Sequence, residues 1–240
     1  MDDRHLERSG AASGIIFVLL FVAGLFFGSP PDFGAPAEEV SRYYIEDQKA
    51  IQTTLVLFTV GLFFFLWFLA SMRAFLHAAE GGAGRLSAAA FGGGLVTAAT
   101  FIVTLTFVAG AAFRPEETLP ELTRTLDDLS FLAFAPGAWA VAAFFAATAA
   151  VTLRTGALPA WLGWLAMLPA ISNALTVGGV FTDSGPFSGD GIFSYVGFFS
   201  FLIWILAASI VLVRSAGAKP AAKTGATGGQ SPNASSTATS

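Results

Sequence analysis

An uncharged apolar run at residues 51–72 constrains this chain more than any other feature. Its 22 residues are dense in Leu, Phe and Val, and they lie between Asp47 and Lys49 on one side and Arg73 on the other. A helix of about 20 apolar residues is long enough to cross the hydrocarbon core of a bilayer. The run therefore predicts a transmembrane helix, whose direction sets that of every later span.

The overall composition indicates that lipid surrounds much of the chain. Of the 240 residues, 55% are hydrophobic and 12% are charged, whereas soluble domains carry roughly 25% charged residues. The mean hydropathy is +0.70. The absence of cysteine excludes disulfides and thiolate chemistry. Because the formal net charge is -4 and no basic stripe is present, we expect the lipid bilayer as a partner and no nucleic acid.

Six apolar runs alternate with polar segments and predict an all-α, polytopic transmembrane helical bundle of three hairpins. The expected spans are residues 11–28, 51–72, 87–113, 129–153, 161–181 and 192–213. They make up a six-helix domain over residues 11–214, preceded by a short terminus at 1–10 and followed by a tail at 215–240. The tail has too few apolar residues to form a core, so we expect it to be disordered. The first run follows acidic residues and precedes a poor cleavage context, so we expect an uncut span.

The distribution of charge predicts how the bundle is oriented. In the six-span topology one side collects eight Lys and Arg residues against four carboxylates, and the other side four against twelve. Loops rich in Lys and Arg stay in the cytoplasm. We therefore expect both termini to be cytoplasmic and the protein to be a multi-pass protein of the cell membrane.

The polar segments before the second and fourth spans both predict amphipathic helices that begin at a proline. In the first of them Val40, Tyr43, Tyr44 and Ile51 recur near helical spacing. This spacing predicts a lead-in helix that runs straight into the span at Ile51. Tyrosine rings are favoured at the level of the lipid headgroups, so we expect both tyrosines there.

The most polar group of residues inside a span is Ser172, Asn173 and Thr176, shortly after Pro169. A proline inside a helix frees a backbone carbonyl. The Asn173 amide is expected to bond to that carbonyl or to a neighbouring helix. We interpret the cluster as structural, with a ligand pocket beside a broken helix as the alternative.

A pair of carboxylates, Asp127 and Asp128, precedes the fourth span on the expected outer side. Paired carboxylates can hold a cation or act as acid and base. At the start of a helix they also interact favourably with the helix dipole. We interpret the pair as a helix cap and keep the chemical role as the alternative.

The sequence contains few residues that could bind a metal or haem or couple transport to ions. The two histidines, His5 and His77, lie outside the expected spans, whereas haem ligation by two histidines needs them on facing helices. No loop has the ligand spacing of a calcium site, so we expect no metal and no cofactor. No charged residue lies at the centre of a span, which argues against a carrier coupled to protons or ions.

The turn after the fourth span, residues 153–164, reads LRTGALPAWLGW. It resembles a recurrent element of uncharacterised bacterial six-helix integral membrane proteins of the domain-of-unknown-function kind. The resemblance implies a fold and a membrane location, and it carries no activity, substrate or catalytic residue. The residues themselves predict an anchor at the inner interface, with Arg154 at the phosphates and Trp161 and Trp164 beside it. A binding site for a lipid headgroup is the alternative.

Three functions remain open from the sequence. We expect a non-enzymatic membrane protein that scaffolds or senses through contacts with lipid or partners. The first alternative is a transporter or channel for a small neutral or apolar solute, which Pro136, Pro169 and Asn173 motivate. The second is a membrane enzyme acting on lipid through Asp127 and Asp128. Glycines spaced four residues apart in the first span would permit a homo-oligomer through small-residue helix faces.

Overall fold

The computed structural model describes residues 3–32, 34–182, 184–188 and 191–217, and the side chains of residues 9–215 within those ranges. Its elements are α1 (Asp3–Gly24), α2 (Ala37–Glu46), α3 (Gln48–Glu80), α4 (Arg85–Phe113), η1 (Pro115–Glu117), α5 (Pro120–Thr155), α6 (Ala160–Thr176), η2 (Val177–Val180) and α7 (Ile192–Gly217). Every element in these ranges is helical, so the predicted all-α class is confirmed. Residues 215–217, the first three of the tail that the sequence predicts to be disordered, form the end of α7, and the rest of that tail lies outside the described residues.

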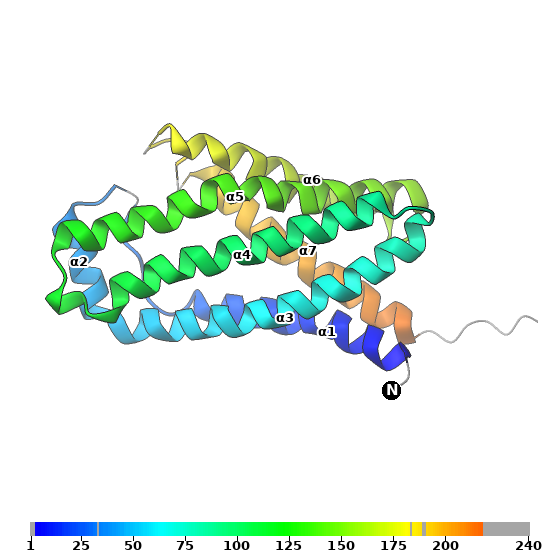
Figure 1. The fold of residues 1–240 in the computed structure, drawn as a ribbon, viewed down its shortest axis with the longest axis horizontal. Coiled ribbons are helices and arrows are strands. Elements are labelled where there is room, and N and C mark those ends of the chain that lie inside the picture. The colour runs from blue at the N-terminus through cyan, green and yellow to red at the C-terminus, as the bar shows by residue number, and fades with distance from the viewer. Residues whose placement is uncertain (1–2, 33, 183, 189–190, 218–240) are drawn as a thin grey trace, which may run out of the picture.

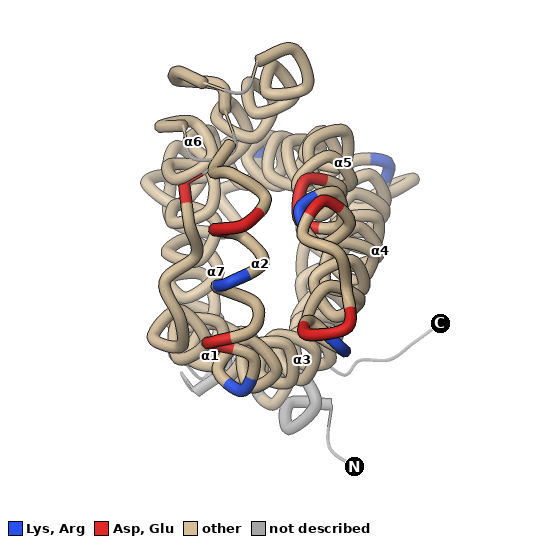
Figure 2. The backbone as a smooth tube through the Cα atoms, turned by 90° about the vertical axis from the view of Figure 1, so that its left-hand side faces the viewer, with Lys and Arg blue, Asp and Glu red and all other residues tan. Residues whose placement is uncertain are grey.

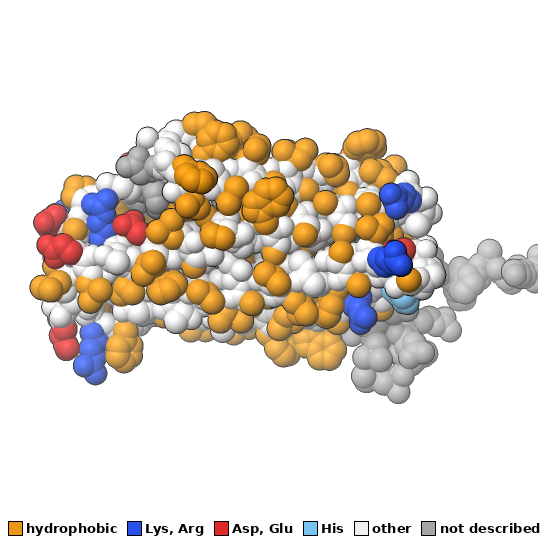
Figure 3. Space-filling model, turned by 45° about the horizontal axis from the view of Figure 1, so that its top comes forward, with side chains coloured by type: hydrophobic (Ala, Val, Ile, Leu, Met, Phe, Trp, Pro, Cys, Tyr) orange, Lys and Arg blue, Asp and Glu red, His pale blue; other side chains and the backbone are white. Residues whose placement is uncertain are grey.

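Within the described residues, five helices are long and apolar enough to cross a membrane: α3, α4, α5, α6 together with η2, and α7. The apolar part of α1 is shorter and covers Ser9–Gly24. Large apolar side chains point outward from the middle of the helices, and Trp139 is 57% exposed. Charged side chains gather at the two ends of the face in Figure 3, and the surface between them is apolar or uncharged. These features are those of a multi-pass membrane protein.

Six helices pack side by side in a closed ring. The order around the ring is α1, α3, α4, α5, α6 and α7, and α7 packs against α1 to complete it. Figure 2 shows this order from one end, with α2 in front of the ring. Each helix therefore has two neighbours, and α1 belongs to the bundle as fully as the longer helices do.

Aromatic side chains fill the centre of the ring. The centroid of the Phe17 aromatic ring on α1 lies 5.0 Å from that of Phe65 on α3 and 5.9 Å from that of Phe201 on α7. Phe145 on α5 lies 5.6 Å from Phe201 and 5.3 Å from Trp204 on α7. These distances and the mostly tilted or edge-on angles are those preferred by aromatic pairs. The core thus connects helices from the first to the last element of the chain.

Proline and glycine lie at several helix boundaries, including the starts of the two predicted lead-in helices. Pro36 and Pro159 directly precede α2 and α6, and Pro120 is the first residue of α5. Gly156 ends α5 with φ 69° in the left-handed region, which favours glycine. Several boundaries differ from the predicted spans: α1 begins at Asp3 and ends at Gly24, α3 continues to Glu80, and α6 ends at Thr176 with η2 after it.

The predicted lead-in helices behave differently from each other. The second one continues without interruption into the span as the 36-residue helix α5. The first one does not run straight into the span: Asp47 separates α2 from α3 with φ -101° and ψ 16°. Figures 1 and 2 show α2 lying across one end of the bundle. The prediction of a straight helix through residue 47 is therefore wrong.

The two ends of the bundle differ in charge. We call the end formed by α2, η1 and the first turns of α5 the acidic end, because Asp and Glu residues gather there (Figure 2). We call the opposite end, with the turns at residues 81–84 and 156–159, the basic end. Helix α1 begins and α7 ends at the basic end (Figure 1).

A close approach between α4 and α5 depends on Gly93. A Cβ atom at this position would lie 2.7 Å from the Ala140 carbonyl oxygen and 2.8 Å from the Phe144 amide nitrogen, whereas one on Gly92 meets nothing within 4 Å. We expect Gly93→Ala to force the helices apart and to lower the free energy of unfolding by about 1–3 kcal/mol. Gly92→Ala is the matched control and should leave stability unchanged or raise it. Thermal unfolding in detergent measures both, and equal unfolding midpoints would contradict the close packing.

Candidate functional site at the acidic end

Helix α5 carries the predicted carboxylate pair beyond the membrane interior. Its 36 residues make a helix about 54 Å long, whereas the hydrocarbon core is about 30 Å thick. The helix begins at Pro120, so Asp127 and Asp128 lie in its third turn. A side chain that far from the first turn does not cap the helix, and the capping interpretation of the pair is wrong.

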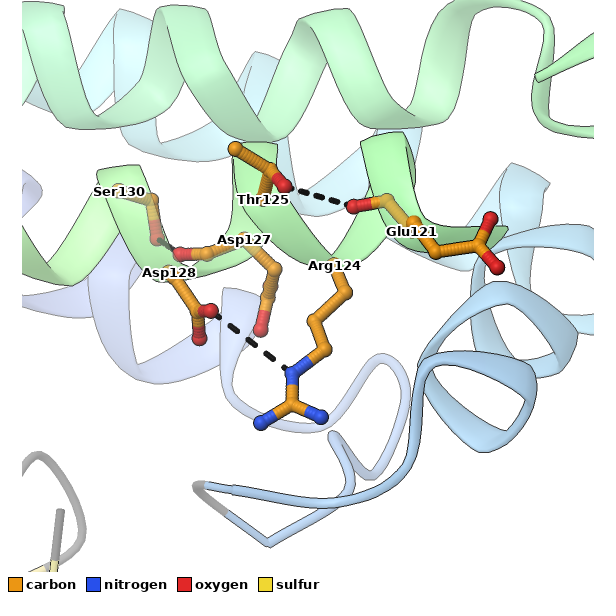
Figure 4. Close-up of polar contacts among 6 residues, drawn as sticks. All are labelled: Glu121, Arg124, Thr125, Asp127, Asp128 and Ser130. Atoms are coloured by element: carbon orange, nitrogen blue, oxygen red, sulfur yellow. Dashed lines mark hydrogen bonds and ion pairs between the residues drawn. The ribbon is translucent and has the colours of Figure 1, made fainter. Parts of the chain in front are cut away.

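The two carboxylates have different partners. The Tyr44 hydroxyl on α2 donates a hydrogen bond of 2.7 Å to Asp127 Oδ1. Asp128 instead forms an ion pair with Arg124, 3.8 Å between Oδ2 and Nε, one helical turn away. Figure 4 shows Arg124, Asp127 and Asp128 projecting from the same side of α5. The pair is therefore divided between a contact to α2 and an exposed ion pair within α5, which contributes little to stability.

A small apolar core, separate from the aromatic one, holds α2 against the bundle. Its buried members are Val40, Tyr44, Ile51, Ala111 and Ala112. The last two belong to the final turn of α4, so α2 covers the end of that helix. Beside this core, the hydrogen bond of the Tyr44 hydroxyl is accompanied by a second polar contact.

That second contact is made at the first residue of α3. Gln48 Nε2 donates 2.9 Å to the carbonyl oxygen of Ala112. The last carbonyl groups of a helix lack partners within the helix, so this bond satisfies one of them. It fixes the start of α3 directly behind the break at Asp47.

Tyr44 is buried against the bundle and does not face the lipid headgroups, although the sequence predicts that it does. Its side chain is 2% exposed. Burial, together with the negative charge of Asp127 and the hydrogen bond to it, raises the pKa of Tyr44 well above its usual value of 10.0. Burial and the charges of Asp47 and Asp127 raise the pKa of Tyr43 to about 12. Both phenols therefore stay protonated at physiological pH, and Tyr44 remains a hydrogen-bond donor.

The polar cluster of α6 forms hydrogen bonds within its own helix. Asn173 Nδ2 donates 2.9 Å to the Pro169 carbonyl, and the Thr176 hydroxyl donates 3.0 Å to the Ser172 carbonyl. The Asn173 bond goes to the carbonyl of the proline itself rather than to the one that the proline frees. The amide also packs against α7, because a Cβ on Gly197 would lie 2.9 Å from Asn173 Nδ2. These contacts favour the structural interpretation of the cluster.

The predicted anchor residues lie together at the basic end. Arg154 is in the last turn of α5, and Trp161 and Trp164 are 53% and 68% exposed near the start of α6. They do not come near the acidic pair, because the length of the bundle separates the two groups. The anchor residues and the carboxylate pair that the sequence singled out thus lie at opposite ends of the bundle and do not form one site.

Sequence reasoning missed two arrangements. The first is the contact between Tyr44 and Asp127, which are 83 residues apart; the spacing of Val40 and Tyr44 revealed a buried face but not its partner. The second is a helix cap by Glu80, whose two carboxylate oxygens accept bonds of 2.9 and 2.8 Å from the amides of Leu86 and Ser87. No sequence signal identifies a capping side chain that belongs to the preceding helix.

Neither metal-binding residues nor comparison with known proteins assigns a function to this end of the bundle. No group of three or more His, Cys, Asp or Glu residues that could hold a metal occurs within the described part of the chain. No family model, no curated protein and no solved structure matches this sequence. The resemblance of the turn at residues 153–164 therefore stays a prediction, and the function is argued from geometry alone.

The raised pKa of Tyr44 gives a prediction for alkaline solution. Unfolding restores the ordinary pKa of 10.0, so the protonated phenol contributes its full stability below pH 10 and loses it as the pH rises further. At pH 8 we expect Tyr44→Phe to lower the free energy of unfolding by about 2 kcal/mol, the range for a hydrogen bond to a charged group. Above pH 10 the difference from wild type should shrink by about 1.4 kcal/mol per pH unit.

Chemical unfolding in detergent between pH 8 and pH 11 measures this difference. Tyr195→Phe, which removes a phenol whose side chain is 54% exposed, is the control and should differ little from wild type at pH 8. A constant difference between wild type and Tyr44→Phe over the whole pH range would contradict the buried phenol.

Proposed function

We propose that the chain is a six-span protein of the bacterial cell membrane with both termini in the cytoplasm. Counting α1 as a span gives six spans, and this count is supported because α1 packs along α3 and α7 and contributes Phe17 to the aromatic core. The orientation is supported by the basic end, where both α1 begins and α7 ends (Figure 1). Lys and Arg residues on short loops favour the cytoplasmic side.

Within that membrane the protein acts as a non-enzymatic sensor or scaffold, and α2 is its movable contact element on the outer side. The observation that carries this function is the way α2 is attached. It is separated from α3 at Asp47, has its own small core, and reaches α5 through the bond from Tyr44 to Asp127. A short helix that has its own small core and is joined to α3 through a single non-helical residue is an element that a partner or lipid can displace.

The alternative of a transporter is weakened by how the centre of the bundle is built. The aromatic core fills the ring, and Asn173 and Thr176 are hydrogen-bonded within their own helix. A groove of about 460 Å³ between α3 and α4 is lined by residues such as Val56, Val60 and Ile102, which are exposed on the outer, lipid-facing surface. That groove offers no path along the bundle axis.

The alternative of a membrane enzyme is weakened by the partners of its candidate groups. Asp127 accepts the bond from Tyr44, and Asp128 is paired with Arg124. A catalytic pair of carboxylates needs both groups to face one reacting centre. Here they contact different elements, which favours a structural and switching role.

Single cysteines test whether the interior is dry. The native chain has none, so Asn173→Cys, Thr176→Cys and Thr100→Cys can each be treated with a membrane-impermeant thiol reagent in intact cells. We expect no labelling of these three and rapid labelling of a Glu39→Cys control on α2. Labelling of the interior positions would support transport. A Glu39→Cys that reacts only after cell lysis would instead contradict the orientation.

A cysteine beneath α2 tests whether this helix opens. Ala111 is fully buried, with 0% exposure, under α2. We expect Ala111→Cys to be labelled slowly in the wild-type background and several times faster when Tyr44→Phe removes the bond to Asp127. Ala98→Cys, in the aromatic core, is the control and should stay protected in both backgrounds.

Two results would overturn the role of α2. Rapid labelling of Ala111→Cys in the wild-type background would mean that α2 does not cover α4. Equally slow labelling with and without the Tyr44 hydroxyl would mean that this hydrogen bond does not hold the helix closed.

A further inference from the structure

The arginines at the basic end lack carboxylate partners. Arg73, Arg85, Arg154 and Arg214 are exposed, and none of them forms an ion pair among the side chains that the structure describes. The two ion pairs in that part of the chain, Arg114 with Glu117 and Arg124 with Asp128, are both at the acidic end. The basic end therefore presents four arginines that no described carboxylate pairs with.

The carboxylate nearest to these arginines in the sequence is already engaged. Glu80 accepts the backbone amides of Leu86 and Ser87 at 2.9 and 2.8 Å, and so it caps α4. Arg73 lies with its guanidinium carbon 5.1 Å from the centre of the Phe91 ring, an arrangement that leaves its N–H groups free to donate. These positions favour binding of an external anion over internal pairing.

The turn between α5 and α6 places a cation beside two interfacial aromatic residues. Gly163 on α6 packs closely on α5, because a Cβ there would lie 2.7 Å from Leu153 Cδ2. This contact brings the start of α6 next to the last turn of α5, which carries Arg154. Trp161 and Trp164 are three residues apart and exposed, so they lie on neighbouring positions of one helix face.

From these observations we propose that the α5–α6 turn at the basic end binds the headgroup of an anionic phospholipid. The Arg154 guanidinium donates to the phosphate, since its planar N–H groups match phosphate oxygens, and the two indole rings lie at the interface beside it. Arg85 at the start of α4 and Arg73 near the end of α3 add positive charge at the basic end. The inference goes beyond the role of α2 and rests on the proposed membrane location, but not on the orientation.

The test compares lipids with the purified full-length protein in mild detergent. Phosphatidylglycerol or phosphatidylcholine is titrated into the micelles while the unfolding midpoint is followed, and native mass spectrometry counts the lipids retained. We expect phosphatidylglycerol to raise the unfolding midpoint in a saturable way, and this effect should weaken as salt is added. Phosphatidylcholine should raise the midpoint much less. Arg154→Gln should weaken the apparent affinity for phosphatidylglycerol about fivefold, the effect of one cation near an anionic surface.

Matched variants separate binding from folding. Arg42→Gln removes an exposed arginine of α2 at the opposite end and should titrate as wild type does. Arg154→Lys keeps the charge but loses the planar N–H groups and should bind with an affinity between those of wild type and Arg154→Gln, while both Arg154 variants should unfold as wild type does in phosphatidylcholine. Equal stabilisation by the two lipids, or an Arg154→Gln protein that binds as wild type does, would overturn the proposal. A saturable shift of the same size with inorganic phosphate alone would assign the turn to a free anion instead.

Because the assay is done in detergent, its result is independent of the cysteine experiments. A wrong orientation or an immobile α2 would leave the lipid titration unchanged. Loss of the lipid effect would likewise leave the role proposed for α2 intact.

Discussion

The packing of aromatic rings at the centre of the bundle is the interaction on which the rest of the structure depends. Lipid solvates apolar side chains as well as a neighbouring helix does, so helices in a membrane associate through close packing rather than through the hydrophobic effect. Phe17, Phe65 and Phe201 come from α1, α3 and α7 and lie within 6 Å of one another by their ring centroids. This contact explains how α1, whose apolar part is short, is kept in the ring.

Polar groups inside the bundle serve the packing of helices. Trp204 donates 2.8 Å from its indole nitrogen to the Leu162 carbonyl and so joins α7 to α6, while the Asn173 amide stays within α6. A hydrogen bond formed where water is excluded is costly to break. The interior is accordingly built to stay closed, and the features able to respond to other molecules lie at the ends.

The two ends are organised by different physical means. At the acidic end a buried hydrogen bond from Tyr44 to Asp127 holds a helix that is otherwise attached by a small apolar core. At the basic end Glu80 caps α4, and Arg73, Arg85, Arg154 and Arg214 have no carboxylate partner among the described side chains. The movable α2 that we propose at the acidic end and the cationic surface at the basic end are suited to the proposed role, in which the protein senses one side of the membrane while it is anchored at the other.

The sequence by itself determined the properties that depend on local chemistry. Long uncharged runs predicted the apolar helices, and prolines predicted where α2 and α5 begin, because proline fixes φ and lacks an amide hydrogen wherever it occurs. Only the tertiary structure decided that one proline-initiated segment turns at Asp47 across the bundle while the similar segment before Asp127 continues as a single helix. It also decided that Asp127 meets Tyr44 rather than capping α5. Contacts between residues far apart in the chain depend on how whole helices pack, and no local pattern contains that information.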